Sequence, residues 1–188
     1  MTDAAMDENI SNNVNELAER TADAPCPVTY REMTLSDLEQ VYQIECKCFS
    51  QPWSMESLIG ELTRNSDIAY YVVADCDGTI AGYAGIWITL DEAHMTNIAV
   101  DEQFRRRGIA RNIILTMMRE AVSRGANNMT LEVREFNYRA QALYASLDFK
   151  KAGVRKRYYS DTGENAFILW NYSIEDTLKK HQNGESRC

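Results

Sequence analysis

The sequence predicts a single α/β domain in which helices cover both faces of a mixed sheet. Its segments follow the order strand, two helices, three strands, helix, strand, helix and two strands. Asp77-Gly78, a strong hairpin signal, joins two of these strands directly. The chain has 188 residues, a typical length for one domain with one core.

The first part of the domain is predicted to contain a strand and two helices. The strand covers residues 28–33. Ser36 is predicted to cap the first helix, because Glu39 follows three residues later at the spacing of a capping box. Ser54 follows Pro52-Trp53 and is predicted to cap the second helix. Apolar residues recur at helical intervals after both serines.

Three strands are predicted in the middle of the chain. The first is rich in β-branched and aromatic residues, which favour strands. Gly82 and Gly85 lie within the second, where they allow a close approach of a neighbour or a bulge. The predicted bounds are residues 68–74, 79–88 and 93–100.

The second half of the chain alternates helices and strands. A long amphipathic helix begins after the Arg105–Ala110 loop and ends before Gly125. A strand is predicted at residues 129–133, followed by a helix at 137–147 with apolar residues on one face. The Asp161-Thr162-Gly163 turn separates the last two strands, predicted at residues 151–158 and 165–172.

The net charge of −8 is unevenly distributed. Residues 1–27 carry six acids and one base (−5), residues 28–174 carry −3, and residues 175–188 carry three of each (0). We therefore expect a mostly disordered acidic extension at 1–27, a folded domain at 28–174 and a C-terminal tail at 175–188. An acidic domain is a poor candidate for direct nucleic-acid binding. Its charge either attracts a cationic substrate or serves only solubility.

Cysteine and apolar patterns bear on the compartment and on metal binding. Five cysteines, an odd number, argue against a disulfide framework, so inert thiols in a reducing cytosol are expected. The Cys46-x-Cys48 spacing does not fit a common zinc site, so no metal is expected. The N-terminus lacks a secretory signal, and no apolar run approaches the roughly 18 residues that span a bilayer. The expected location is cytoplasmic, without a membrane partner.

The segment from Asn97 to Ala110 carries the strongest functional signal. A predicted strand runs through a turn into a basic loop that contains Gly108, and a helix follows. This arrangement directs backbone N–H groups to one point, where the helix dipole favours an anion. Arg106 and Arg107 add positive charge, so a pyrophosphate would fit. The alternative is a basic helix start with a packing glycine, because a single glycine loop is weak evidence.

Arg105-Arg-Arg-Gly-Ile-Ala110 resembles the Gln/Arg-x-x-Gly-x-Gly/Ala signature of the GNAT acetyltransferases. Further blocks are similar to the RimI-type ribosomal-protein-alanine N-acetyltransferases; they are Phe49-x-x-Pro-Trp-Ser54, Asn97-Ile-Ala-Val100, Leu131-Glu-Val-Arg134, Asn137 through Leu143-Tyr144, and Arg157-Tyr-Tyr159. The resemblance covers residues 28–172. It implies the GNAT fold, with a mostly antiparallel central sheet and strands that splay apart at the acetyl-CoA site.

The resemblance also implies a site for acetyl-CoA, the co-substrate. Amides of the loop would hold the pyrophosphate, and the strand before the loop would pair through its backbone with the pantetheine arm. Asn137 would cap its helix and also hydrogen-bond the CoA arm. The implied cofactor-binding residues are Ile98, Ala99, Val100, Arg105, Arg106, Arg107, Gly108, Ile109, Ala110 and Asn137.

Two residues are candidates for the chemistry. Glu132 is either a solvent-facing strand carboxylate or, as the resemblance implies, the general base. Tyr144 is either a core aromatic of an amphipathic helix or, as the resemblance implies, the general acid that protonates the departing CoA thiolate. Tyr158-Tyr159 could line a peptide groove or be simply packed, and His94 is given no role. Asp148 and Ser160 depart from the family pattern, which often has Gly and Pro there.

The predicted function is acetyl transfer from acetyl-CoA to the α-amine of a protein N-terminus. Transfer would be direct, because no nucleophile–histidine–acid arrangement stands out. The resemblance implies the N-terminal alanine of a small-subunit ribosomal protein as the substrate. Two alternatives remain: a GNAT enzyme that acetylates a small-molecule amine or a lysine side chain, and a non-catalytic acyl-CoA-binding module.

Overall fold

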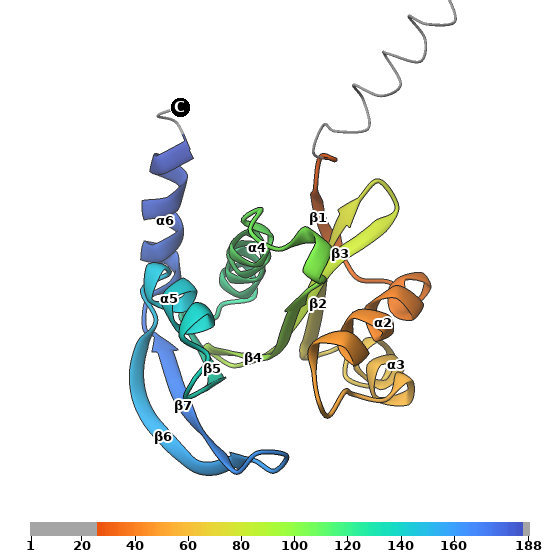
Figure 1. Cartoon of the computed structure of the whole chain (residues 1–188). Helices are drawn as coiled ribbons and strands as arrows, with labels where there is room; N and C mark the ends of the chain where they lie inside the picture. Colours follow the sequence, from red (N-terminus) through yellow and green to blue (C-terminus); the bar gives the residue numbers. More distant parts are fainter. Residues whose placement is uncertain (1–25, 186–188) are drawn as a thin grey trace, which may run out of the picture.

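The structure, a computed structural model, describes residues 26–185, so the predicted extension at 1–27 lies outside it apart from Cys26 and Pro27. Within these residues seven strands form one sheet in the order β1-β2-β3-β4-β5-β7-β6 (Figure 1). Neighbouring strands are antiparallel except for the parallel pair β4 and β5, as the predicted mixed sheet requires. The strands are β1 (Thr29–Glu32), β2 (Ala69–Cys76), β3 (Thr79–Thr89), β4 (Glu92–Val100), β5 (Asn128–Arg134), β6 (Lys150–Tyr159) and β7 (Glu164–Asn171).

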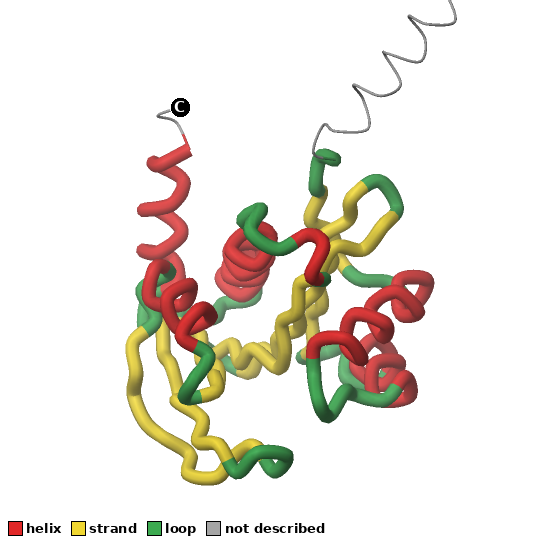
Figure 2. The backbone as a smooth tube through the Cα atoms, in the orientation of Figure 1, coloured by secondary structure: helices red, strands yellow, loops and turns green. Residues whose placement is uncertain are grey.

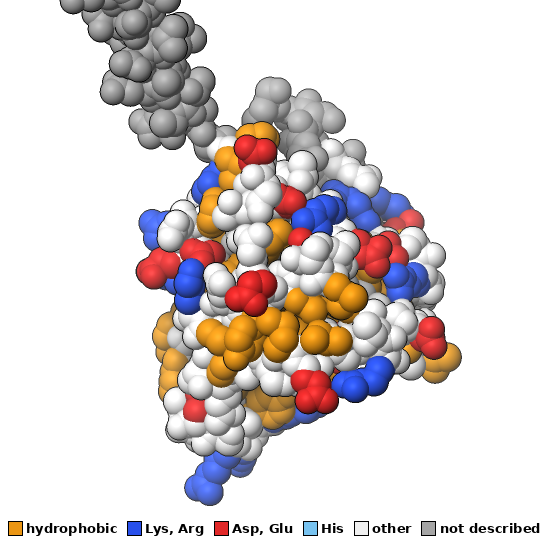
Figure 3. All heavy atoms as spheres, turned by 90° about the vertical axis from the view of Figure 1, so that its right-hand side faces the viewer, with side chains coloured by type: hydrophobic (Ala, Val, Ile, Leu, Met, Phe, Trp, Pro, Cys, Tyr) orange, Lys and Arg blue, Asp and Glu red, His pale blue; other side chains and the backbone are white. Residues whose placement is uncertain are grey.

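Helices cover both faces of the sheet, as predicted (Figures 1 and 2). On one face, α2 and α3 pack over a core that includes Tyr71 and Tyr83. On the other, α4 buries residues such as Ile113 and Met117. Figure 3 looks onto the α2–α3 side, where apolar side chains form a band between charged ones. The helices are α2 (Leu38–Cys48), α3 (Met55–Thr63), α4 (Ile109–Ser123), α5 (Tyr138–Ser146) and α6 (Ile174–Glu185), with short 3-10 turns at Leu35–Asp37 and Glu102–Phe104.

The strands β4 and β5 splay apart, as the resemblance implied (Figure 1). They pair at only three positions, the last of which joins His94 to Thr130. A bulge follows in β4, because Gly85 of β3 pairs with Asn97 while the next residue pairs with Met95. A Cβ on Gly85 would collide with the Tyr71 ring and lie 2.8 Å from Thr96 Oγ1, so glycine is required at this crossing.

One predicted helix cap is wrong. The first helical turn begins at Thr34, which forms a capping box with Asp37, whereas Ser36 and Glu39 do not cap a helix. The Asp37 carboxylate accepts the Thr34 N–H at 2.8 Å and pairs with Arg31 at 2.8 Å. Because Arg31 fixes this carboxylate, the first helical turn begins two residues earlier than the local pattern indicates.

The second predicted cap is confirmed. The Ser54 Oγ accepts a hydrogen bond from the Ser57 N–H at 3.1 Å, at the start of α3. Gly125 adopts a φ of 93° directly after α4, the left-handed conformation expected at a helix end.

The C-terminal segment is largely helical, which corrects the tail predicted at residues 175–188. Helix α6 covers most of it and packs against α4. Ile174 and Leu178 are buried in the core, and Thr177 between them accepts a hydrogen bond from Asn171 at 2.8 Å. Few buried residues distinguish this segment from a polar tail, which is why its composition was misleading.

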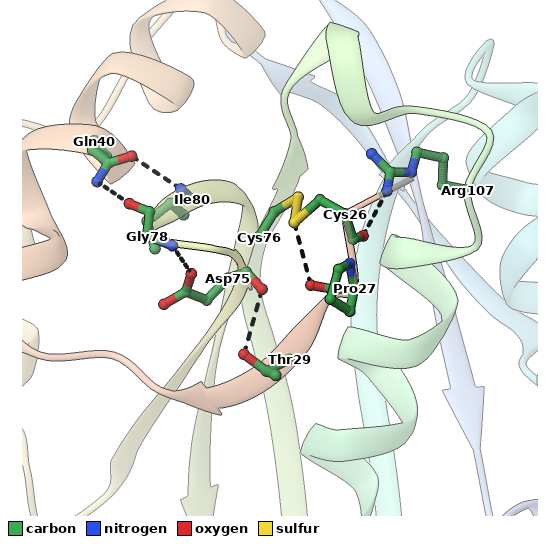
Figure 4. The surroundings of a disulfide bond; sticks show 9 residues. All are labelled: Cys26, Pro27, Thr29, Gln40, Asp75, Cys76, Gly78, Ile80 and Arg107. Carbon is green, nitrogen blue, oxygen red and sulfur yellow. Dashed lines mark hydrogen bonds between the residues drawn. A yellow bond between two sulfur atoms is a disulfide. The ribbon is translucent and has the colours of Figure 1, made fainter. Parts of the chain in front are cut away.

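Cys26 and Cys76 form a disulfide, which corrects the expectation of inert thiols for these two residues (Figure 4). Thr29 pairs with Asp75 where β1 runs antiparallel to β2, so the two cysteines meet at one end of that strand pair. Their Cα atoms lie 5.7 Å apart. The bond ties the chain that enters β1 to the end of β2.

Candidate active site

A cavity of about 420 Å³ opens where β4 and β5 separate. The loop between α2 and α3 forms one wall, and Tyr158 and Tyr159 of β6 form another. Glu132 of β5, Tyr144 of α5 and Asn137 at the start of α5 all line this cavity. Ile98 of β4 lines it as well, so the structure brings together the predicted base, the predicted acid and two predicted cofactor-binding residues.

Glu132 is held between two basic side chains at the point where the strands part. Its Oε2 lies 2.7 Å from His94 Nε2, and its Oε1 lies 3.1 Å from an Arg155 guanidinium nitrogen. The hydrogen bond with His94 lowers the pKa of Glu132 below its ordinary value, and this outweighs the opposing effect of burial. Glu132 is therefore ionised near neutral pH. With only 10% of its side chain exposed, it is not a solvent-facing strand carboxylate.

His94 is a residue of this site that the sequence did not reveal. It belongs to the last residue pair before the strands separate, and its ring reaches Glu132 on the neighbouring strand. It lines the cavity and packs edge-on against Trp87, with 6.3 Å between the ring centroids. The signal that places it is the register of β4 against β5, which no short motif contains.

Tyr144 belongs both to the core and to the cavity wall. It is buried, and its ring packs edge-on against Phe149 with 5.7 Å between centroids. Burial raises the pKa of Tyr144 above its ordinary value, and the neighbouring Tyr159 adds to this effect. The phenol is therefore protonated at neutral pH. Asn137 caps α5 as predicted, since its Oδ1 accepts from the Ala140 N–H at 3.2 Å.

The loop between β4 and α4 fits an anion. Arg106 and Gly108 have left-handed φ angles of 70° and 75°, and Gly108 caps α4 without a side-chain hydrogen bond. The first N–H groups of α4 are thus left without a capping side chain. A Cβ added to Gly108 would meet no atom within 4 Å, so the approach to these groups is open. A pyrophosphate suits such a position at a helix N-terminus.

The three arginines of this loop have different surroundings. Arg105 Nε donates to the Val100 carbonyl at 3.1 Å, which holds its charge against β4. Arg107 donates to the Cys26 carbonyl at 2.9 Å (Figure 4). Arg106 is exposed. Two of the three side chains therefore shape the loop.

The side chains of the predicted cofactor-binding residues of β4 and α4 lie mainly in or against the core. Ile98 lines the cavity, whereas Ala99 is buried toward α2 and α3, and Val100 packs against the core on the α4 side. Ile109 is buried in the same core, and Ala110 is partly buried. Any contact of these residues with a ligand would therefore depend mainly on backbone groups, of which the Val100 carbonyl already accepts from Arg105.

Two segments that are distant in sequence meet beside the cavity. The Ser50 hydroxyl bonds the Asp161 carboxylate, and the Ser160 hydroxyl donates to Gln51 Oε1 at 3.2 Å. Arg134 in turn holds Asp161 at 2.8 Å. The turn between β6 and β7 is thereby joined to the loop between α2 and α3. Gln51 and Arg134 line the cavity, so this junction forms part of its wall.

The fold and the cavity at the parted strands agree with a family comparison. A sequence model of the acetyltransferase (GNAT) family matches residues 38–149. The chain belongs to this family of acetyltransferases. Among residues 26–185, no helix has both the length and the apolar character to cross a membrane. No three potential metal-ligating side chains gather in that part of the chain either.

Curated relatives and a solved structure are N-acetyltransferases of one kind. The putative ribosomal protein bS18-alanine N-acetyltransferase of Bacillus subtilis is 39% identical over 140 residues, which cover 74% of this chain and 92% of that protein. The ribosomal protein bS18-alanine N-acetyltransferase of Salmonella typhimurium is 37% identical and covers 73% and 92%. The crystal structure of the ribosomal-protein-S18-alanine N-acetyltransferase from Escherichia coli matches with a TM-score of 0.70 at 32% identity, over 77% of this chain and 92% of that chain. This chain is an N-acetyltransferase similar to these enzymes.

Proposed function

We propose that the chain transfers the acetyl group of acetyl-CoA to the α-amine of the N-terminal alanine of ribosomal protein bS18. The observation that carries the proposal is the position of Glu132, paired with His94 and Arg155 in the cavity where β4 and β5 part. The substrate follows from the relatives, which are named for this alanine and cover most of the chain. An enzyme that acts on a ribosomal protein works where ribosomes are, so the proposed location is the cytoplasm.

Acetyl-CoA would occupy the gap between β4 and β5. The amides at Gly108, Ile109 and Ala110 would hold the pyrophosphate, with Arg106 adding charge. The backbone of residues 98–100, called the cofactor strand below, would pair with the pantetheine arm. Asn137 would bond the arm from the start of α5. The thioester would then lie in the cavity, between Glu132 and Tyr144.

Glu132 would accept the proton of the incoming amine. An N-terminal ammonium has a pKa of about 7.7–8.0, so one mild deprotonation prepares it for attack. The ionised carboxylate attracts the ammonium electrostatically and takes one proton from it, directly or through a water molecule. The neutral nitrogen then attacks the thioester carbon with its lone pair, and the thiolate leaves as the amide forms. His94 and Arg155 keep this carboxylate oriented and charged before the substrate arrives.

Tyr144 would protonate the departing thiolate. Its raised pKa keeps the phenol protonated at neutral pH, so its O–H is available as a donor to the sulfur. A thiolate with a parent pKa near 8.5 is already a reasonable leaving group, so this donor helps its departure without being indispensable. Cys48 also lines the cavity, but burial raises the pKa of its thiol. A protonated thiol is a poor nucleophile, which favours direct transfer over an acyl-enzyme.

Access to the cavity favours a chain end over an internal residue. The Ser50–Asp161 and Gln51–Ser160 contacts restrict the cavity at its side, so an extended N-terminus would enter end-on. A lysine side chain also needs a stronger base, since its pKa is about 10.4. Acetylation of lysine or of a small amine is the competing function.

The test is an acetylation assay on matched peptides. A peptide with the N-terminal sequence of bS18 is compared with the same peptide blocked at its N-terminus and carrying an internal lysine. We expect acetyl transfer to the free N-terminus, with loss of activity when alanine is replaced by a bulky residue. Faster reaction of the blocked peptide would show that the amine class is wrong.

A further inference from the structure

Two buried carboxylates lie beside the active site and take no part in the chemistry above. Glu45 of α2 is 1% exposed, and Glu61 of α3 is 6% exposed. Both accept hydrogen bonds from buried aromatic side chains, and Glu45 also lines the cavity. Burial raises the pKa of Glu45 to about 6. A buried carboxylate lowers stability unless its partners compensate, so its place in the cavity wall requires a reason.

One oxygen of Glu45 is bonded to the loop before α3. The Trp53 N–H donates to Glu45 Oε1 at 3.0 Å. Trp53 and Phe49 of this loop line the cavity, and Gln51 between them meets the turn after β6. The carboxylate therefore holds the wall along which a peptide would enter.

The other oxygen of Glu45 is connected to β4. Tyr83, fully buried on β3, donates its hydroxyl hydrogen to Glu45 Oε2, and its hydroxyl oxygen accepts from Asn97 Nδ2 at 2.9 Å. Asn97 Oδ1 accepts from Thr96 Oγ1 at 3.1 Å. Thr96 is the residue of the β4 bulge, and Ile98 begins the cofactor strand. A chain of hydrogen bonds thus runs from Glu45 to the side chains of Asn97 and Thr96, the two residues that directly precede the cofactor strand.

We propose that Glu45 is a positioning residue. Its carboxylate fixes the loop between α2 and α3 (residues 49–54) and the cofactor strand relative to each other. The proposal rests on the proposed function and adds a specific requirement to it. In the proposed complex the amine is held along the loop and the thioester along the cofactor strand. A change in the distance between these two walls would therefore change the distance between the amine nitrogen and the thioester carbon. A misplacement of about 1 Å costs up to 10²-fold in rate.

The geometry explains why a carboxylate occupies this position. Trp53 N–H and the Tyr83 hydroxyl are both donors, and each has a separate carboxylate oxygen as its acceptor. A glutamine offers one oxygen and one NH₂ group, so it would leave one of the two donors facing another donor. Glu45→Gln is therefore nearly isosteric and still disrupts the link between the two walls.

The experiment compares Glu45→Gln and Tyr83→Phe with Thr177→Val in the full chain. Thr177 is a buried side chain of α6 that bonds Asn171, so its variant loses a buried hydrogen bond away from the cavity. Calorimetry gives the Kd of acetyl-CoA, and initial rates give kcat and KM on the bS18 peptide. Thermal unfolding gives the Tm of each variant.

We expect Glu45→Gln to lower kcat/KM about 10- to 100-fold and to raise the Kd of acetyl-CoA at least about threefold. Tyr83→Phe should also lower kcat/KM and raise the Kd of acetyl-CoA, each by a smaller factor than Glu45→Gln. The double variant should lose no more than Glu45→Gln alone, because both residues act in one hydrogen-bond chain. Thr177→Val should keep kcat/KM and Kd within about twofold of the wild-type values, even if its Tm decreases as much as that of Glu45→Gln.

The proposal is overturned if kcat/KM and Kd change no more in Glu45→Gln and Tyr83→Phe than they do in Thr177→Val. If Glu45→Gln does not fold, Tyr83→Phe decides, since it keeps the packing of the ring. If the wild type binds acetyl-CoA but acetylates no N-terminal peptide, the proposed function fails. The Kd of acetyl-CoA in the variants then decides alone on the positioning role of Glu45.

Discussion

Glu132→Gln keeps the shape of the side chain where β4 and β5 part and removes its ability to take a proton. His94 and Arg155 remain beside it, so the cavity keeps its lining. A positioned general base contributes about 10²–10⁴-fold to a rate. We therefore expect kcat on the bS18 peptide to fall by this factor at neutral pH, while the Kd of acetyl-CoA stays the same.

The structure limits how much of this loss can come from unfolding. The side chains of His94 and Arg155 are 38% and 52% exposed, so solvent screens both ion pairs. Pairs of this kind contribute up to about 1 kcal/mol to stability. For a domain of this size, the loss of both pairs corresponds to a Tm decrease of up to about 4–8 °C. A rate loss of 10²-fold or more with a decrease this small is therefore a loss of chemistry.

The pH dependence of the rate separates a base from a merely charged residue. Because His94 lowers the pKa of Glu132, the wild-type carboxylate is ionised throughout the neutral range. In Glu132→Gln the rate should rise as the amine loses its own proton, at a pKa of about 7.7–8.0, so the loss should shrink above pH 8.

The assay records initial rates from pH 6 to 9.5 for wild type, Glu132→Gln and Glu120→Gln. Glu120 is a matched control, since it is an ion-paired carboxylate on α4, outside the residues that line the cavity. Its variant should match wild type throughout. A near-wild-type rate of Glu132→Gln at pH 7 would refute the assignment of the base.

Three further outcomes test the other parts of the site. Tyr144→Phe should lower kcat at all pH values up to 9, because thiolate departure still lacks its acid; a loss that disappears at high pH contradicts this. Gly108→Glu should abolish the Tm increase that acetyl-CoA gives the wild type, through charge repulsion at the α4 N-terminus and strain at a φ of 75°. Unchanged affinity would remove the pyrophosphate site. Cys76→Ser opens a disulfide that spans 50 residues and should lower unfolding free energy by about 2–4 kcal/mol, measured without reductant; equal stability would show that the bond does not form.

The fold could be predicted from the sequence where the signal is local. Asp77-Gly78 takes positive φ angles of 53° and 83° at the hairpin, and Ser54 caps α3 as its position indicates. Asp148, where the family often has Gly, adopts a left-handed φ of 62° and pairs with Lys180 at 2.8 Å. The hairpin and the Ser54 cap depend on residues within a few positions of one another. At Asp148 the fold keeps the left-handed conformation although the residue is not glycine.

The missed features depend on contacts between distant segments. The cap at Thr34 is favoured by Arg31, whose guanidinium also reaches Asp75 of β2 at 2.9 Å. His94 faces Glu132 only because β4 pairs with β5 in one particular register. The partnership of Cys26 with Cys76 likewise requires β1 to lie beside β2. No local pattern contains this information.

The three-pair junction of β4 with β5 leaves the sheet incomplete beyond His94. In the proposed complex the pantetheine arm completes it, and the co-substrate serves as an additional, removable strand between the β1–β4 and β5–β7 halves. Such pairing uses backbone groups alone. Packing in the core, and not cofactor binding, would then determine which side chains occur at residues 98–100. Ligand that binds only the folded state stabilises it in proportion to the logarithm of its concentration. The free energy of unfolding of this enzyme would then rise with the concentration of acetyl-CoA, by about 1.4 kcal/mol for each tenfold increase above the Kd.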